Sequence, residues 1–144
     1  MSRIALVTGG GGYIGSALCR ALQGQGWCVR ATARDPATVT ATPCIALELE
    51  DAAAGHVAAQ VCRDAEVVFH LAGIAHRGAD ALALERINCD ATLALARAAE
   101  AAGVVHFVYL SSLYAGACDP GARGARGEAY ARSKRLAELG LLGR

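Results

Sequence analysis

The sequence predicts an α/β fold in which one doubly wound parallel sheet is covered by helices on both faces. Five short apolar runs alternate with longer, alanine-rich stretches whose apolar residues recur at helical spacing. The runs are continuously apolar, which is typical of parallel strands buried on both faces. A length of 144 residues suits one domain, spanning residues 1–144.

The first half of the chain contains three of the predicted strands. Arg3–Val7 is a short apolar run that stops at a glycine cluster, and a helix over Tyr13–Gln23 follows. Val29–Ala33 and Cys44–Leu49 are the second and third strands. A weaker helical pattern covers Asp51–Cys62.

The second half repeats the alternation. Val67–Leu71 is the fourth strand and is rich in β-branched residues. Apolar residues at helical spacing predict a long helix over Ala81–Ala102, which Gly103 ends. Phe107–Leu110 is the fifth strand, and Glu128–Leu142 is the last helix.

Composition and charge exclude several classes of partner. The formal net charge is +1 and aromatic residues make up 5% of the chain, which argues against nucleic acid and against an acidic membrane surface. No apolar run is long enough to span a bilayer, and the N-terminus does not resemble a signal peptide.

The cysteines indicate a reducing, cytoplasmic environment. None are spaced as C-x-x-C, and no histidine lies at zinc-finger spacing, so we expect buried thiols and no metal site. The six are Cys19, Cys28, Cys44, Cys62, Cys89 and Cys118.

The strongest local signal is the run TGGGGYIG, Thr8–Gly15, between the first strand and the first helix. Glycines let the backbone turn tightly and approach a pyrophosphate, and a helix N-terminus offers free N–H groups to it. This context is the one that a dinucleotide-binding (Rossmann) motif requires. The motif therefore predicts NAD or NADP as cofactor.

Two neighbouring residues after the second strand point to different cofactors. Asp35 lies about 20 residues beyond Gly15, where an acid holds the ribose 2′-hydroxyl of NAD. Arg34 precedes it and can hold the 2′-phosphate of NADP. Both can also be exposed loop charges. Because Ala33 at the strand tip is not acidic, we favour NADP slightly.

Tyr130 and Lys134 are spaced to share one face of the last helix. A free tyrosine has a pKa near 10 and is a poor base at neutral pH, and a neighbouring ammonium favours the phenolate. Lys134 is the only lysine in the chain. The pair is therefore a candidate acid–base couple.

Ser111 and Ser112 directly follow the fifth strand. Ligands of open parallel sheets bind at the carboxyl ends of the strands, so a hydroxyl here can donate to a substrate oxygen. The glycine- and arginine-rich stretch Asp119–Gly127 comes next and predicts a solvated loop, or an arginine loop that meets a phosphate-bearing substrate.

Together these motifs resemble the extended short-chain dehydrogenase/reductase family, the NAD-dependent epimerase/dehydratase group. The resemblance runs along the whole chain and is carried by five segments in order. They are TGGGGYIG at Thr8–Gly15, HLAG at His70–Gly73, Asn88, YLSS at Tyr109–Ser112 and YARSK at Tyr130–Lys134.

The resemblance implies a role for each matching residue. Ser112 binds the reacting oxygen, Tyr130 is the acid or base, and Lys134 bonds the cofactor ribose and tunes Tyr130. His70 is expected to pack under the cofactor. The cofactor-binding residues are then Thr8, Gly9, Gly12, Tyr13, Ile14, Gly15, Arg34, Asp35, Leu71, Ala72, Gly73, Asn88 and Lys134.

The resemblance also implies a reaction and a missing part. VFHLAGIAH and FVYLSS are similar to nucleotide-sugar 4-epimerases, whereas VRATARDP is similar to NADPH-dependent ketone reductases. A nucleotide-sugar epimerase or dehydratase is expected; the alternatives are a ketone or aldehyde reductase and an inactive dinucleotide-binding fragment. Family members continue into further strands and a substrate domain, so this chain corresponds to their N-terminal part. They often form homodimers through the two segments matching Ala81–Ala102 and Glu128–Leu142.

Overall fold

The computed structural model describes residues 3–39, 42–52, 56–75, 80–116 and 128–143. Its centre is one five-stranded parallel sheet. The strands are β1 (Ile4–Thr8), β2 (Cys28–Ala33), β3 (Cys44–Ala46), β4 (Val67–His70) and β5 (His106–Tyr109). Their order, β3-β2-β1-β4-β5, confirms the predicted doubly wound class.

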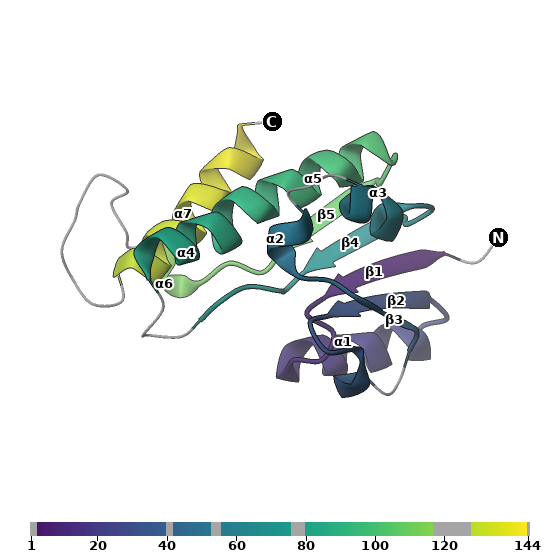
Figure 1. The fold of residues 1–144 in the computed structure, drawn as a ribbon. Coiled ribbons are helices and arrows are strands. Elements are labelled where there is room, and N and C mark those ends of the chain that lie inside the picture. The colour runs from purple at the N-terminus through teal and green to yellow at the C-terminus, as the bar shows by residue number, and fades with distance from the viewer. Residues whose placement is uncertain (1–2, 40–41, 53–55, 76–79, 117–127, 144) are drawn as a thin grey trace.

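Helices lie on both sides of this sheet (Figure 1). They are α1 (Tyr13–Gly24), the 3₁₀ turn η1 (Pro36–Thr38), α2 (Leu49–Ala52), α3 (His56–Cys62), α4 (Ala81–Glu85), the π-helical turn η2 (Arg86–Asp90), α5 (Ala91–Ala101), α6 (Leu113–Gly116) and α7 (Glu128–Leu142). Figure 1 shows α1 on one side and α4, α5 and α7 on the other. No helix of the described residues is both long and apolar enough to cross a membrane.

Alternate residues of β1 enter two separate cores. Leu6 packs in the core that Leu95 of α5 enters on one face of the sheet. Ala5 and Val7 pack in the core that Leu22 of α1 enters on the other face. Burial on both faces is the reason why this strand reads as one continuous apolar run.

The third strand is shorter than the predicted Cys44–Leu49. It pairs with β2 over three positions and ends at Ala46, opposite Ala33, the last residue of β2. The Leu47 N–H still donates to the carbonyl oxygen of Ala33 at 3.0 Å, but Leu47 and Leu49 are buried in a core and α2 begins at Leu49. The predicted strand was too long because an apolar run does not distinguish strand residues from residues, such as these two leucines, that pack in a core after the strand has ended.

Two predicted helices each cover more than one described element. In the predicted stretch Asp51–Cys62 the described residues belong to α2 and α3, and residues 53–55 lie outside the described ranges. The predicted Ala81–Ala102 contains the π-helical turn Arg86–Asp90 between α4 and α5. Gly103 ends this helical stretch as predicted, with a φ of +77°. The helix Glu128–Leu142 is confirmed, and α6 was not predicted.

The cysteines were expected to be buried thiols, and the stretch Asp119–Gly127 was expected to be a loop. Of the cysteines, the five that lie within the described residues are free thiols; Cys28 is exposed and Cys44 is half-buried, so the prediction of burial was wrong for these two. Cys28 is the first residue of β2, and Cys44 is the first residue of the edge strand β3. Cys118 and the stretch Asp119–Gly127 lie outside the described residues.

Candidate functional site

The glycine run forms a tight turn between β1 and α1. Gly9 has a φ of +73°, which side-chain-bearing residues rarely adopt. The amide of Gly12 donates to the carbonyl oxygen of Gly9 at 3.0 Å and closes the turn. Gly15 is buried, and a Cβ placed there would collide with the same carbonyl oxygen. The turn therefore requires glycine at these positions.

The turn leads into the N-terminus of α1. Gly12 is the cap residue, and because glycine has no side chain, no side-chain hydrogen bond caps the start of the helix. The first amides of a helix have no partner within it, so those of the first turn of α1 can donate to an anion. Tyr13 and Ile14, the first two residues of α1, are 95% and 53% exposed, so neither is buried in the core.

A pocket of about 710 Å³ opens at the carboxyl ends of β1, β2 and β4. Its lining includes seven of the predicted cofactor-binding residues. These seven are Gly9, Gly12, Arg34, Asp35, Leu71, Ala72 and Gly73. This is the edge of a parallel sheet where ligands are expected.

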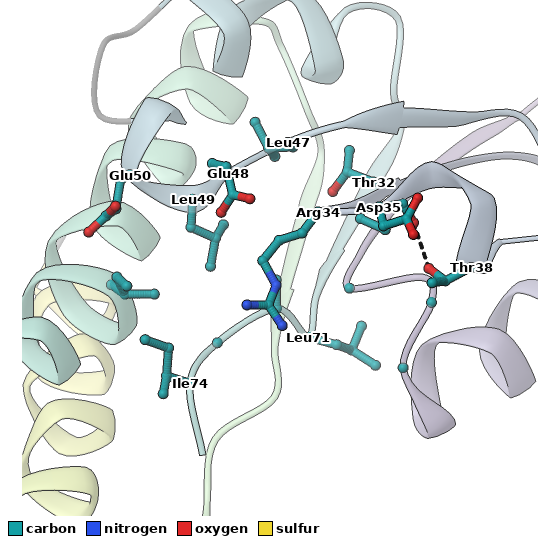
Figure 2. A pocket seen from close by; sticks show the side chains of 17 residues that line it. Thr32, Arg34, Asp35, Thr38, Leu47, Glu48, Leu49, Glu50, Leu71 and Ile74 are labelled. Carbon is teal, nitrogen blue, oxygen red and sulfur yellow. Dashed lines mark hydrogen bonds between the residues drawn. The ribbon is translucent and has the colours of Figure 1, made fainter. Parts of the chain in front are cut away.

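The two candidate cofactor-selecting residues are oriented differently (Figure 2). The side chain of Arg34 projects into the pocket, and its guanidinium has no hydrogen bond or ion pair with any described residue. Asp35 lies beside Thr38 and accepts the backbone N–H of Ala37 at 3.0 Å, as the cap of η1. The exposed cation is therefore presented to a ligand, whereas the carboxylate supports a turn.

Several lining residues were missed by sequence reasoning. The structure adds Gly11, Thr32, Thr38, Leu47, Glu48, Leu49, Glu50, Ile74 and Ile87. Most of them follow strand ends, so their position along the chain was an available signal. Asp35-Pro36 also predicts a capped turn, which would have indicated Thr38.

Thr8 and Asn88 lie beside the pocket without lining it. The Thr8 hydroxyl is fully buried and accepts the backbone N–H of Ala72 at 3.2 Å. The Asn88 amide accepts from the N–H of Ile74 at 2.8 Å and donates to its carbonyl oxygen at 2.9 Å. It also donates to the Ser133 hydroxyl at 3.1 Å. These residues hold the segment after β4 in place.

Helix α7 brings Lys134 against the end of β5. Lys134 is 6% exposed, and its ammonium donates to the carbonyl oxygen of Leu110 at 2.7 Å and lies 4.3 Å from the centre of the Tyr109 ring. Burial lowers the pKa of Lys134 to about 8. Tyr130 lies one turn earlier on the same helix and is half-buried.

The lowered pKa of Lys134 predicts a pH-dependent stability. Between about pH 8 and its ordinary pKa of 10.5, the unfolded chain keeps a proton that the folded chain has released. Proton linkage then makes this lysine's contribution to folding stability rise with pH in that window, with no change below it. Urea unfolding of the protein and of Lys134→Met should show the wild-type free energy of unfolding rising relative to the variant. A constant difference between them would contradict the shift.

The two serines after β5 have different partners. The Ser111 hydroxyl donates to Glu138 of α7 at 2.5 Å. The Ser112 hydroxyl oxygen accepts the N–H of Tyr114 at 3.3 Å, and its proton has no acceptor among the described residues. Ser112 is therefore the serine that can donate to a substrate. Within the described ranges, no group of three or more His, Cys, Asp or Glu side chains could hold a metal ion.

Comparisons with known proteins agree with this geometry. The 3-beta-hydroxysteroid dehydrogenase of Mycolicibacterium neoaurum is 32% identical over 114 residues, which are 74% of this chain and 31% of that protein. A short-chain dehydrogenase/reductase superfamily protein of Agrobacterium tumefaciens, solved with bound NAD, matches with a TM-score of 0.80 and 28% identity over 96% of this chain and 44% of its own.

A third relative is a nucleotide-sugar enzyme. The UDP-glucose-4-epimerase of Stenotrophomonas maltophila, solved with NAD and formylated UDP-arabinopyranose, matches with a TM-score of 0.81 and 26% identity over 99% of this chain and 48% of its own. The chain thus spans about a third of the curated relative and less than half of these two solved chains.

The sequence profile of the NAD dependent epimerase/dehydratase family matches residues 5–142, which is nearly the whole chain. The matched range includes the glycine turn, the pocket and the helix that carries Tyr130 and Lys134. The parallel sheet has the architecture of the solved relatives. This chain belongs to the NAD dependent epimerase/dehydratase family.

Proposed function

We propose that this chain is the dinucleotide-binding part of an NAD(P)-dependent oxidoreductase or epimerase. The observation that carries the proposal is the pocket between the glycine turn and Arg34. A Cβ on Gly9 would lie 3.0 Å from the backbone nitrogen of Ala72, and one on Gly12 would lie 3.3 Å from the carbonyl oxygen of Gly9, so there is little room for side chains on this turn. A pyrophosphate on this turn also meets the amides of the first turn of α1.

The bound nicotinamide would supply hydride transfer, and the residues around Lys134 would handle the proton. Tyr130 takes the proton from a substrate hydroxyl or returns it to a carbonyl oxygen. The charge of Lys134, one helical turn away, favours the phenolate form of Tyr130. Ser112 donates a hydrogen bond to the same substrate oxygen and orients it.

For the substrate we propose a nucleotide sugar first. This rests on the UDP-sugar bound by the solved epimerase, whose identity to this chain is 26%. A hydroxysteroid alcohol, or the ketone of the reverse reaction, is the second candidate, because the curated relative named for hydroxysteroids is 32% identical over 74% of this chain. A redox-neutral epimerase leaves the cofactor unchanged after turnover, whereas oxidation of a hydroxysteroid forms the reduced cofactor and reduction of a ketone consumes it, so cofactor absorbance during turnover separates these activities.

We further propose that NADP is preferred over NAD. The Arg34 guanidinium projects into the pocket with no partner among the described residues, whereas Asp35 caps η1. A 2′-phosphate would give Arg34 charge-assisted hydrogen bonds that a 2′-hydroxyl cannot.

The Arg34→Ala variant tests this preference. NADPH affinity should fall about tenfold or more, as expected for the loss of hydrogen bonds between charged groups, and NADH affinity should stay nearly constant. Nicotinamide fluorescence titrations of both cofactors measure the change. The control is Arg20→Ala, which removes an exposed arginine of α1 that does not line the pocket. Equal losses for both cofactors would contradict the assignment.

A further inference from the structure

A buried hydrogen-bond chain runs beneath the pocket and is centred on His70. This residue ends β4 and is fully buried. Its Nδ1 lies 2.7 Å from the Thr8 hydroxyl oxygen, and its Nε2 lies 2.9 Å from the Thr92 hydroxyl oxygen. Both threonines are also fully buried. The side chains of Thr8, His70 and Thr92 therefore satisfy one another's hydrogen-bonding groups away from water.

The two ends of the chain determine where each hydrogen lies. The Thr92 hydroxyl donates to the carbonyl oxygen of Asn88 at 2.9 Å, so its oxygen must accept from His70. Nε2 of His70 therefore carries the proton, and Nδ1 is an acceptor. The Thr8 hydroxyl then donates to Nδ1, while its oxygen accepts the N–H of Ala72 at 3.2 Å.

Burial keeps the ring neutral. It lowers the pKa of His70 to about 3, and the ammonium of Lys134 on α7 acts in the same direction. The ring also stacks on Tyr109 of β5, with 5.9 Å between the ring centres. With both nitrogens engaged and no contact with solvent, His70 cannot exchange protons with a substrate.

We propose that His70, as the neutral Nε2–H tautomer, is a positioning residue that sets the spacing between two backbone walls of the pocket. It does so by orienting the Thr8 hydroxyl to receive the Ala72 amide. One wall is the glycine turn, which starts at Gly9, and the other is the segment after β4, which contains Ala72. A Cβ on Gly9 would lie 3.0 Å from the Ala72 nitrogen, so the walls are already in contact. The expected effect of His70 on cofactor affinity rests on the proposed function.

The tautomer is tested first, on the protein without cofactor. Nitrogen-15 chemical shifts should show Nε2 of His70 protonated and Nδ1 unprotonated, with no change on either side of the ordinary histidine pKa of about 6.5. The opposite tautomer, or titration of His70 in this range, would overturn the proposal.

Two variants then separate positioning from general stabilisation. In His70→Asn the amide oxygen is as many bonds from the backbone as Nδ1, so the link to Thr8 is retained. In His70→Gln the amide nitrogen corresponds to Nε2, so only the link to Thr92 is retained. Both remove an imidazole from the core, and we expect similar losses of thermal stability.

Amide hydrogen exchange and cofactor titration provide the readouts. In His70→Gln the Ala72 amide should exchange about tenfold faster and cofactor affinity should fall about tenfold, whereas both changes should be small in His70→Asn. Equal effects in the two variants, following their stability, would overturn the positioning role. If no variant, and not even the wild type, binds a dinucleotide, the proposed function fails, but Ala72 exchange still decides the role of His70.

Discussion

Replacing Tyr130 by phenylalanine should lower turnover by about 10²- to 10⁴-fold, the range typical of a lost general acid or base. The phenyl ring keeps the packing of α7, and only the hydroxyl that would move the proton is removed. The pocket is lined by residues that precede α7, so cofactor affinity should remain within about twofold. Cofactor titration and an assay with UDP-sugar and hydroxysteroid substrates measure the two quantities.

The matched control for this variant is Tyr114→Phe. Tyr114 lies in α6, follows Ser112 by two residues and is 69% exposed. Losing its hydroxyl should leave turnover unchanged. If Tyr130→Phe retains full turnover, the acid–base assignment is wrong. A wild-type chain that binds cofactor and turns over no substrate would instead support the alternative of a dinucleotide-binding portion alone.

Replacing Gly15 by alanine should abolish measurable cofactor binding. The new Cβ would collide with the carbonyl oxygen of Gly9 and lie 2.9 Å from its carbonyl carbon and 3.0 Å from the Cα of Gly10. These are backbone atoms, so the whole glycine turn must move. Overpacking of this kind costs about 1–3 kcal/mol of stability, and the displaced turn no longer fits a pyrophosphate.

The same substitution at Gly24, in the last turn of α1, is the control. A Cβ there would have no atom within 4 Å. Alanine is a better helix former than glycine, so Gly24→Ala should leave binding intact and raise stability by about 0.5–1 kcal/mol. Circular dichroism melting and cofactor titration of both variants check the pair. Intact binding in Gly15→Ala would mean that the turn does not hold the cofactor.

The elements that sequence reasoning predicted well are those decided by local pattern. The glycine turn depends on residues that are adjacent in the chain, and the helix Glu128–Leu142 shows its own periodicity. The failures lie where packing overrides pattern. Leu47 and Leu49 looked like strand residues, but β2 ends at Ala33, to which Leu47 makes one more backbone hydrogen bond, and both leucines pack in a core.

The candidate site divides in the same way. The sequence placed Arg34 and Asp35 at a strand end but left their roles open, and the fold turns the arginine into the pocket while the aspartate caps η1. For the serine pair, the family resemblance favoured Ser112, and the fold adds that Ser111 donates to Glu138 of α7. In both cases two residues adjacent in the sequence have different surroundings in the fold, and a local sequence pattern does not show those surroundings.

By itself the sequence determined the fold class, the cofactor motif and the Tyr130–Lys134 spacing, because each depends on residues close together in the chain. Only the tertiary structure decided how these parts support one another. His70 meets Thr8 across 62 residues and Thr92 across 22, and the fold buries all three side chains. Such partners are brought together by packing, and it is burial away from water that makes each of their hydrogen bonds obligatory.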